Sequence, residues 1–338
     1  MIDINWGLDR SIIKELNKPY YCKKSVAVLQ PLNNKELYHR KLECLKPWCA
    51  TCGGKNGLLH QNRIEAVNKR LPEVEQIALR QFVFTIPCEM RRYFFCKDSL
   101  NHLFGIVQRV IEKAFGIEVG KPAKDGEIKY QLDKGVIAYL HLIGGHDSDI
   151  NRKFHPHVNV HVIEVKSALN SEEDLWLSGA ELQAIKNNFR KALKSYAAYI
   201  GAKINEDAGT MSRIYKKINV ADVHYKHKYT YVEVANAINY MTEPLSHAYF
   251  DELQQEKQNP LLELLILGLK RFRVIRYWGS ISDHRYKHFL SQFPGSFIKG
   301  KKTYGMKLLR ISSVEYEQAM LGMMGQNFTT SQSNYDAF

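Results

Sequence analysis

The feature that most constrains the fold is the stretch from Phe154 to Glu164, in which polar and apolar residues alternate. Apolar residues at positions 158, 160 and 162 fall between polar ones, which is the two-residue period of a half-buried β-strand. Such a strand directs four polar side chains to one face: His155, His157, Asn159 and His161. Three of the thirteen histidines of the chain therefore share one face of a single strand.

Imidazoles two residues apart on a strand lean the same way, so they can bind one divalent cation together. The candidate ligands of this metal are His155, His157, Asn159 and His161. Imidazole suits Mn, Zn and Ni while Mg prefers oxygen donors, so Mn²⁺ or Mg²⁺ in an open site is the expected working ion. The alternative is a polar sheet face whose histidines only hydrogen-bond to their neighbours.

A second cluster consists of three cysteines in one short segment: Cys44, Cys49 and Cys52. A Cys-x-x-Cys pair followed by two glycines is typical of a zinc knuckle, because glycine lets backbone amides face the sulfurs. Since a structural Zn²⁺ needs four ligands, we take Cys22 as the fourth, with His60 and then His39 as alternatives. The other interpretation of this segment is a loop of free thiols.

The charge of the chain indicates a polyanionic partner. Lys and Arg number 48 against 35 Asp and Glu, a formal net charge of +13, which favours nucleic acid or an anionic membrane surface. The first residues do not read as a signal peptide, and the longest apolar run, 261–269, is interrupted by Glu263 and too short to span a bilayer. We therefore expect a cytoplasmic protein with reduced cysteines and no membrane partner.

Two stretches, 213–231 and 270–279, interleave basic and aromatic residues. This composition suits single-stranded nucleic acid, because rings stack on bases while cations meet phosphates. A solvated loop or an edge strand is the alternative. The residues expected to contact DNA are Lys226, Lys228, Tyr229, Arg271, Arg273 and Arg276.

The remaining periodicity predicts the elements around the histidine strand. Strands are expected at 78–87 and 136–143, the latter paired antiparallel with the histidine strand, and amphipathic helices at 100–114 and 179–200. His141, in the strand at 136–143, lies either near the metal or in a structural role. A further helix at 232–243 is ended by Pro244 and carries Tyr240 off its apolar stripe, facing a cleft or packed at the helix end.

Four features, in this order, resemble the histidine-hydrophobic-histidine (HUH) endonucleases. They are the cysteine cluster, a strand ending Thr85-Ile86-Pro87, the motif from His155 to Asn159, and Tyr240 in the segment from Ile238 to Pro244. The resemblance is closest to rolling-circle replication initiators (Rep) of plasmids and viruses, and to related single-strand DNA transposases with an N-terminal cysteine motif. It covers roughly residues 40–285, and the histidine motif and the tyrosine helix are its specific parts.

The resemblance implies an α+β fold, with a central antiparallel sheet of ferredoxin or RRM type flanked by helices. It implies four regions: a zinc-binding module at 1–75, the nuclease domain at 76–250, a helical and basic extension at 251–322, and a disordered tail at 323–338. His157 and its neighbours would hold the catalytic metal. Tyr240 would attack single-stranded DNA, leaving a 5′-phosphotyrosine and a free 3′-hydroxyl, with a host helicase and polymerase as further partners.

Three departures from the family pattern bear on these expectations. The histidine pair of the family falls on His157 and Asn159, so either His155 or His161 would supply the missing imidazole. Relatives with two tyrosines carry them one helical turn apart, whereas Asn236 occupies the earlier position here, which favours the one-tyrosine class. The basic residue that relatives often carry three positions after the tyrosine is replaced by Glu243.

The sequence thus predicts a metal-dependent tyrosine endonuclease and strand transferase that initiates replication, with a transposase of the same superfamily as the sibling hypothesis. A hypothesis of a different class is a non-catalytic, zinc-containing nucleic-acid-binding protein, which binds DNA in a salt-sensitive way but forms no covalent adduct. A third, a small-molecule metalloenzyme of cupin type, explains neither the net charge nor the tyrosine helix.

Overall fold

The computed structural model describes Cys22 and residues 25–31, 38–41, 44–118, 130–143, 154–245, 250, 253, 260–270, 272–283 and 306–312. Arg271 and the tail 323–338 lie outside the described residues. The chain divides into two compact units. The larger unit comprises residues 63–243 and 259–293, and the smaller one comprises 1–62, 244–258 and 294–338.

The larger unit is built on a five-stranded antiparallel sheet with the strand order β8-β3-β7-β6-β9. Its strands are β3 (Ile77–Thr85), β6 (Gly135–Ile143), β7 (Phe154–Val165), β8 (Val223–Lys228) and β9 (Ile275–Gly279). The predicted antiparallel pairing of 136–143 with the histidine strand is confirmed by the register of β6 and β7. The chain therefore has the expected α+β class, with the histidine strand at the centre of its sheet.

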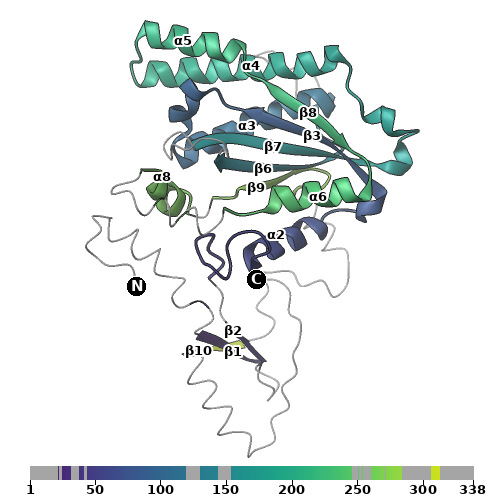
Figure 1. Cartoon of the computed structure of the whole chain (residues 1–338), viewed down its shortest axis with the longest axis vertical. Coiled ribbons are helices and arrows are strands. Elements are labelled where there is room, and N and C mark those ends of the chain that lie inside the picture. Colours follow the sequence, from purple (N-terminus) through teal and green to yellow (C-terminus); the bar gives the residue numbers. More distant parts are fainter. Residues whose placement is uncertain are drawn as a thin grey trace, which may run out of the picture. The chain divides into compact units, whose positions relative to one another are not determined.

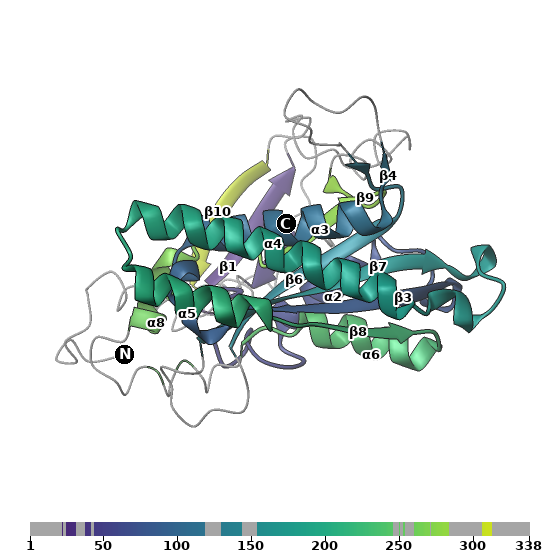
Figure 2. The same ribbon diagram turned by 90° about the horizontal axis from the view of Figure 1, so that it is seen from above.

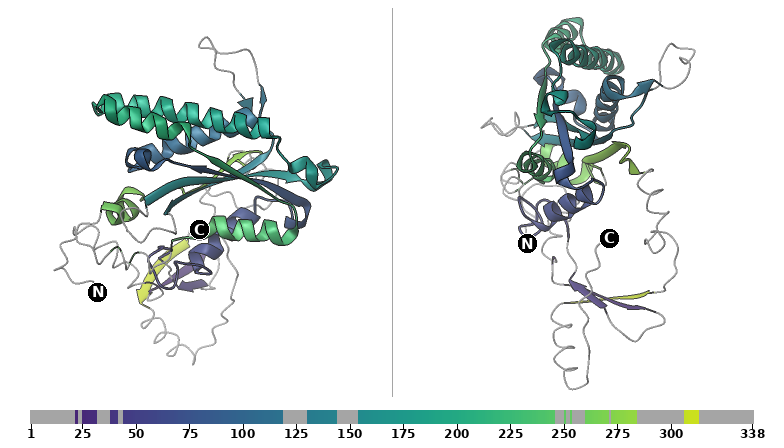
Figure 3. Two further views of the ribbon diagram at one scale, coloured as in Figure 1. Left: turned by 45° about the horizontal axis from the view of Figure 1, so that its top comes forward. Right: turned by 90° about the vertical axis from the view of Figure 1, so that its right-hand side faces the viewer.

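Helices cover both faces of this sheet (Figures 1 and 3). One face carries α3 (Lys97–Phe115) and α4 (Gly179–Lys203), and α5 (Ala208–Asn219) runs beside α4 (Figure 2). The other face carries α6 (Tyr231–Thr242). The shorter elements are η3 (Val74–Gln76), η4 (Cys88–Phe94), β4 (Ile117–Glu118), β5 (Tyr130–Gln131), η5 (Lys166–Ala168), η6 (Glu172–Leu175), α8 (Pro260–Glu263) and the π-helix η7 (Leu264–Gly268).

The alternation of β7 divides its side chains between two environments. Val158, Val160 and Val162 are fully buried on the α3/α4 face, where the aromatic core includes Phe84 packed edge-on against Phe189, with ring centroids 5.1 Å apart. The odd-numbered residues of β7 point to the α6 face. There α6 packs its apolar stripe, including Ile238 and Met241, over one end of the sheet. The two-residue period thus places the histidines beside α6.

The ends of α6 follow from its sequence. Thr230 caps the N-terminus: its side chain accepts a hydrogen bond from the amide of Glu233, whose carboxylate in turn accepts from the Thr230 amide. The helix ends at Thr242, two residues before Pro244, which cannot donate a backbone hydrogen bond. Tyr240 is therefore in the last turn of this helix.

The smaller unit contains a three-stranded antiparallel sheet of order β10-β1-β2, with β1 (Ser25–Pro31), β2 (Tyr38–Lys41) and β10 (Met306–Ser312) (Figure 1). It also contains the cysteine segment and the start of α2 (Leu58–Asn68). Trp48 packs against Phe250, with ring centroids 5.4 Å apart. Among the described residues, every helix is too short or too polar to cross a membrane.

Candidate active site

The strand register places His141, on β6, beside the predicted histidines of β7. His157 on β7 lies directly opposite His141 on β6, and their ring centroids are 5.0 Å apart. On its own strand, His157 lies beside His155, with centroids 5.3 Å apart. Two imidazoles that share one ion through N–metal bonds of about 2.1 Å have ring centres roughly 4.5 to 6 Å apart. The centroid distances of both pairs fall within this range.

The orientation of the His157 ring is fixed by the backbone. Its Nδ1 lies 2.8 Å from the carbonyl oxygen of His155. Because a carbonyl only accepts hydrogen bonds, this bond requires a proton on Nδ1 and leaves the lone pair on Nε2. A ligating histidine commonly donates its other ring nitrogen to a backbone carbonyl in this way. His157 is thereby prepared to bind a metal through Nε2.

These imidazoles are held in the neutral form that a metal ligand needs. Burial, followed by the charges of His157 and His161, lowers the pKa of His141 to about 3. Burial and Arg91 lower the pKa of His155 to about 4, and burial also lowers the pKa of His157. Desolvation disfavours the charged imidazolium, so all three rings carry a free lone pair at neutral pH.

Asn159 and His161 lie further along the same face but are more deeply buried. Asn159 is 2 % exposed and His161 is fully buried. Within the described part of the chain, the side-chain nitrogen Nδ2 of Asn159 and both ring nitrogens of His161 lack a hydrogen-bond partner. Four residues on a strand span about 13 Å, so His161 and His157 cannot reach one ion. Of the two candidates for the missing imidazole, His155 lies within reach of His157, as does His141.

Tyr240 lies at the solvent-exposed edge of this cluster. Its side chain is 53 % exposed, and its ring meets that of His141 edge to face with centroids 5.2 Å apart. His141 in turn touches His157, so a phenol and two neutral imidazoles from three elements converge on one face of the sheet. The phenol is accessible to a large substrate rather than packed into the core.

Two residues hold the helix end that carries Tyr240. The hydroxyl of Tyr139 donates to the carbonyl of Glu243 at 2.9 Å, and Arg63 donates to the carbonyl of Thr242 at 3.4 Å. Arg63 also donates to the Tyr139 hydroxyl at 3.3 Å. The C-terminal carbonyls of a helix lack intrahelical donors and carry partial negative charge, so a guanidinium there stabilises the helix end. Tyr139 and Arg63 therefore position the phenol of Tyr240.

The residues expected to contact DNA flank the histidines on both edges of the sheet. Lys226 on β8 is exposed, and Gln81 on β3 lies between it and His161 in the same row of the α6 face. Lys228 and Tyr229 follow at the end of β8, and the Tyr229 ring lies 4.9 Å from the Lys166 ammonium. Arg273 and Arg276 lie at the opposite edge, before and within β9, and the side chain of Arg276 lies on the α3/α4 face rather than on the face of the histidines.

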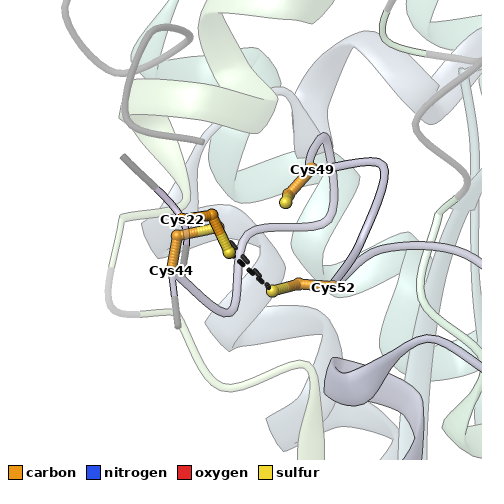
Figure 4. Close-up of side chains that lie close together, drawn as sticks. All are labelled: Cys22, Cys44, Cys49 and Cys52. Atoms are coloured by element: carbon orange, nitrogen blue, oxygen red, sulfur yellow. Dashed lines mark hydrogen bonds between the residues drawn. The ribbon is translucent and has the colours of Figure 1, made fainter. Parts of the chain in front are cut away.

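The cysteine cluster lies in the smaller unit and unites all four predicted ligands (Figure 4). The Sγ atoms of Cys22, Cys44, Cys49 and Cys52 all lie within 4.8 Å of one another. Cys52 Sγ is 3.5 Å from that of Cys22 and 3.8 Å from that of Cys44. In a tetrahedral site with Zn–S bonds of 2.3 Å, sulfurs are about 3.8 Å apart. The four cysteines can thus bind a metal such as zinc.

Local backbone geometry explains why glycines follow these cysteines. Gly54 has a φ of +78°, and a Cβ on Gly53 would lie 1.7 Å from the carbonyl oxygen of Pro47. Burial raises the pKa of Cys52 to about 11, and neighbouring thiolates add to this rise because like charges repel. The alternative ligand His60 has another partner: its Nδ1 accepts a hydrogen bond from the amide of Asn56 at 3.0 Å.

The described side chains form one group of three or more thiol, imidazole or carboxylate ligands within 4.8 Å, and that group is the cysteine cluster. The contacts among the described histidines are pairs: His141 with His157 and His155 with His157. Comparison with known proteins adds no assignment, because no protein-family model, curated protein or solved structure matches the chain.

The sequence patterns left the role of His141 open and did not indicate Arg63 or Arg91 as residues of this site. Arg91 in η4 lowers the pKa of both His155 and His157, so its charge acts directly on the imidazoles. Strand alternation does place His141 on a definite face of its strand, but its partner depends on the register between β6 and β7. The positions of the two arginines follow from tertiary packing alone.

Proposed function

We propose that this chain cleaves and rejoins single-stranded DNA through a covalent tyrosine intermediate, as a metal-dependent tyrosine endonuclease and strand transferase of the HUH type. One observation carries the proposal: the exposed phenol of Tyr240 lies against His141, which is paired with His157. A nucleophile beside two neutral imidazoles that can share an ion is the arrangement this chemistry needs. The net charge of +13 fits a nucleic-acid substrate.

In the proposed reaction the Tyr240 oxygen attacks a phosphodiester phosphorus and gives up its proton to solvent. The bond from phosphorus to the 3′-oxygen breaks, that oxygen takes up a proton, and the 5′-phosphate remains esterified to Tyr240. Attack by a 3′-hydroxyl on this ester restores the phosphodiester and frees the phenol. When bound, Mn²⁺ or Mg²⁺ would stabilise the charge that develops on the phosphate oxygens.

The other residues bind and position. His157, through Nε2, and His141 are the first choice of ligands, with His155 next to them, and Arg91 adds positive charge where the phosphate would lie. Asn159, two residues from His157 on the same face, stays a candidate oxygen ligand, whereas His161 lies too far along β7 to share that ion. Lys226, Lys228 and Tyr229 would bind the strand at one edge of the sheet, and Arg273 and Arg276 at the other.

The process we propose is initiation of rolling-circle replication, because the free 3′-hydroxyl can prime synthesis once a helicase and polymerase are recruited. A transposase would use the same chemistry and is the sibling proposal. The four-cysteine cluster would bind one structural Zn²⁺, with Cys22 as the fourth ligand, since its sulfur spacing matches tetrahedral thiolate coordination.

The test is formation of a covalent adduct. Wild-type protein is incubated with Mn²⁺, circular single-stranded DNA and a labelled pool of random single-stranded oligonucleotides, and denaturing gels are read for labelled protein. Tyr231→Phe is the matched control, because Tyr231 lies on the same helix and is 52 % exposed. We expect adduct with wild type and with Tyr231→Phe, and none with Tyr240→Phe.

Two outcomes would overturn the proposal. DNA binding without adduct from any of the three proteins would indicate a non-catalytic nucleic-acid-binding protein. An adduct that persists in Tyr240→Phe would move the nucleophile to another tyrosine.

A further inference from the structure

The free edge of β9 carries a pocket that is distinct from the histidine cluster. It has a volume of about 660 Å³, within the range of small-ligand sites, and lies in the larger unit between β9 and the first turns of α3. Its charged and aromatic lining includes Arg70, Lys97, Phe272, Arg273, Arg276 and Asp283. The pocket therefore combines cations with a flat apolar surface.

The charges in this pocket do not balance. Asp283 is its one carboxylate among the described lining residues, and it pairs with both Arg70, at 2.8 Å, and Arg273, at 2.5 Å. Lys97 and Arg276 have no carboxylate partner among the residues that the structure describes. Burial and the charge of Arg273 lower the pKa of Arg276, so adding an anion would relieve an unfavourable field. The pocket is suited to an anionic ligand.

The cationic groups are already oriented by aromatic rings. The guanidinium of Arg276 lies 4.0 Å from the centroid of Phe104 and 5.5 Å from that of Phe272. Arg276 also donates to the side-chain oxygen of Asn101 in α3. A guanidinium held against aromatic rings in this way is suited to bind a phosphate, and Phe272, half-buried beside it, offers a ring on which a base can stack.

The pocket lies close to the histidines along the sheet. Ile275, which lines it, is directly opposite Tyr139 on β6, and Tyr139 is directly opposite Asn159 on β7. Two strand spacings, about 10 Å, separate β9 from β7 within the sheet. Arg276 lies opposite Ala138, which lies opposite Val160, so its side chain is on the α3/α4 face. A DNA strand that reaches both the pocket and the histidines therefore has to pass around the outer edge of β9.

We propose that this pocket binds a single nucleotide of the DNA strand, with its phosphate on Lys97 and Arg276 and its base against Phe272. Between this nucleotide and the phosphate that Tyr240 attacks, the strand would pass around the outer edge of β9. The inference rests on the proposed function for the identity of the strand as DNA, but it concerns binding and needs neither metal nor cleavage.

The test measures binding with all metal chelated. A fluorescein-labelled 12-nucleotide single strand is titrated with wild type, with Lys97→Gln/Arg276→Gln, and with Lys191→Gln/Lys203→Gln, which removes two exposed charges on α4. Anisotropy at several salt concentrations should show at least a tenfold rise in Kd for the pocket variant and less than threefold for the control. The salt slope of the pocket variant should fall by about 0.7, for the one phosphate that Lys97 and Arg276 would neutralise together.

A second measurement locates the nucleotide directly. Oligonucleotides carrying one photoreactive thymidine are crosslinked to wild-type protein, and the modified peptide should contain Phe272 from one labelled position only. This result does not depend on whether the double variant folds. A Kd equal to that of the control double variant, or crosslinks that avoid this segment, would overturn the inference.

Competition separates a nucleotide site from a plain phosphate site. Thymidine monophosphate should displace the crosslink at concentrations at which inorganic phosphate does not. Equal displacement by both would overturn the base-binding part. Because the adduct assay reads the chemistry of Tyr240 and these assays read the pocket, failure of one proposal is distinguishable from failure of the other.

Discussion

The rings of His141 and Tyr240 lie edge to face with their centroids 5.2 Å apart, although they belong to a sheet strand and a helix that are distant in sequence. This contact joins the helix end to the paired imidazoles. It depends on Tyr139 and Arg63, which bind the last carbonyls of α6 and so fix where the phenol stands. The candidate site is thus a product of sheet register and helix anchoring together.

The first prediction separates cleavage from DNA binding. His141→Ala and His157→Ala should each abolish adduct formation, because each removes one of two imidazoles that can share an ion. Affinity for single-stranded DNA should change by less than about threefold, because lysines and arginines supply most of it. Adduct gels and anisotropy measure the two quantities. His224→Ala, an exposed histidine of β8, is the control and should leave both unchanged. Normal cleavage by His141→Ala would show that His141 is not part of the catalytic site.

The second prediction concerns pH. Two histidines with the ordinary pKa of 6.5 lose about fifteenfold in metal affinity between pH 8 and pH 6, because protons compete for the lone pairs. The pKa of His141 is lowered to about 3 and that of His157 is lowered as well, both chiefly by burial. Protonation then competes only at lower pH, so Mn²⁺ affinity from calorimetry should fall less than threefold over the same interval. A fifteenfold loss would contradict this arrangement.

Local patterns predicted the parts of this structure that depend on neighbours in sequence. The alternation at 154–164 indicated a strand with its histidines on one face, and the stripe at 232–243 indicated a helix with Tyr240 off its apolar face. The register of two paired strands does not follow from such local patterns, because it depends on how the strands are aligned with each other. Only the pairing of β6 with β7 shows that His141 lies opposite His157.

The strand conformation of β9, at the edge of the sheet, also depends on its pairing with another strand. Its sequence, Ile275 to Gly279, is short and carries Arg276, so it reads as a basic strip rather than as a strand. Pairing with β6 gives it strand form, and the pocket at its edge needs Arg70 and Lys97 from distant elements. The fourth cysteine was likewise a choice among candidates, because nothing local links Cys22 to the Cys44–Cys52 segment. The strand β9, the lining of its pocket and the fourth cysteine are therefore determined by tertiary contacts and not by local propensity.

The third prediction concerns the cysteine cluster. The protein should contain about one equivalent of zinc by mass spectrometry, since four sulfurs stand at tetrahedral spacing. Cys22→Ser and Cys49→Ser should each lower the bound zinc at least tenfold in the presence of a competing chelator. Cys88→Ser should retain it, because Cys88 is an exposed cysteine outside the cluster. Full zinc content in Cys22→Ser would instead favour a different fourth ligand.

The fourth prediction tests the cap of the helix that carries the phenol. Thr230→Ala removes the side chain that accepts from the Glu233 amide, and loss of such a cap costs about 1 kcal/mol of the free energy of unfolding. Urea unfolding followed by circular dichroism measures this change. Ser212→Ala, at an exposed position inside α5, should cost less than about 0.5 kcal/mol. An equal effect of both substitutions would show that the cap contributes nothing.

The last prediction turns on His161, the fully buried imidazole whose two ring nitrogens lack a partner among the described residues. A buried polar group without hydrogen bonds costs about 1 to 3 kcal/mol, which an apolar group of similar size avoids. His161→Leu should therefore raise the free energy of unfolding in urea by about 1 kcal/mol or more. Because His161 is about 13 Å along the strand from His157, adduct formation should persist in this variant. A lower free energy of unfolding in His161→Leu would contradict this prediction.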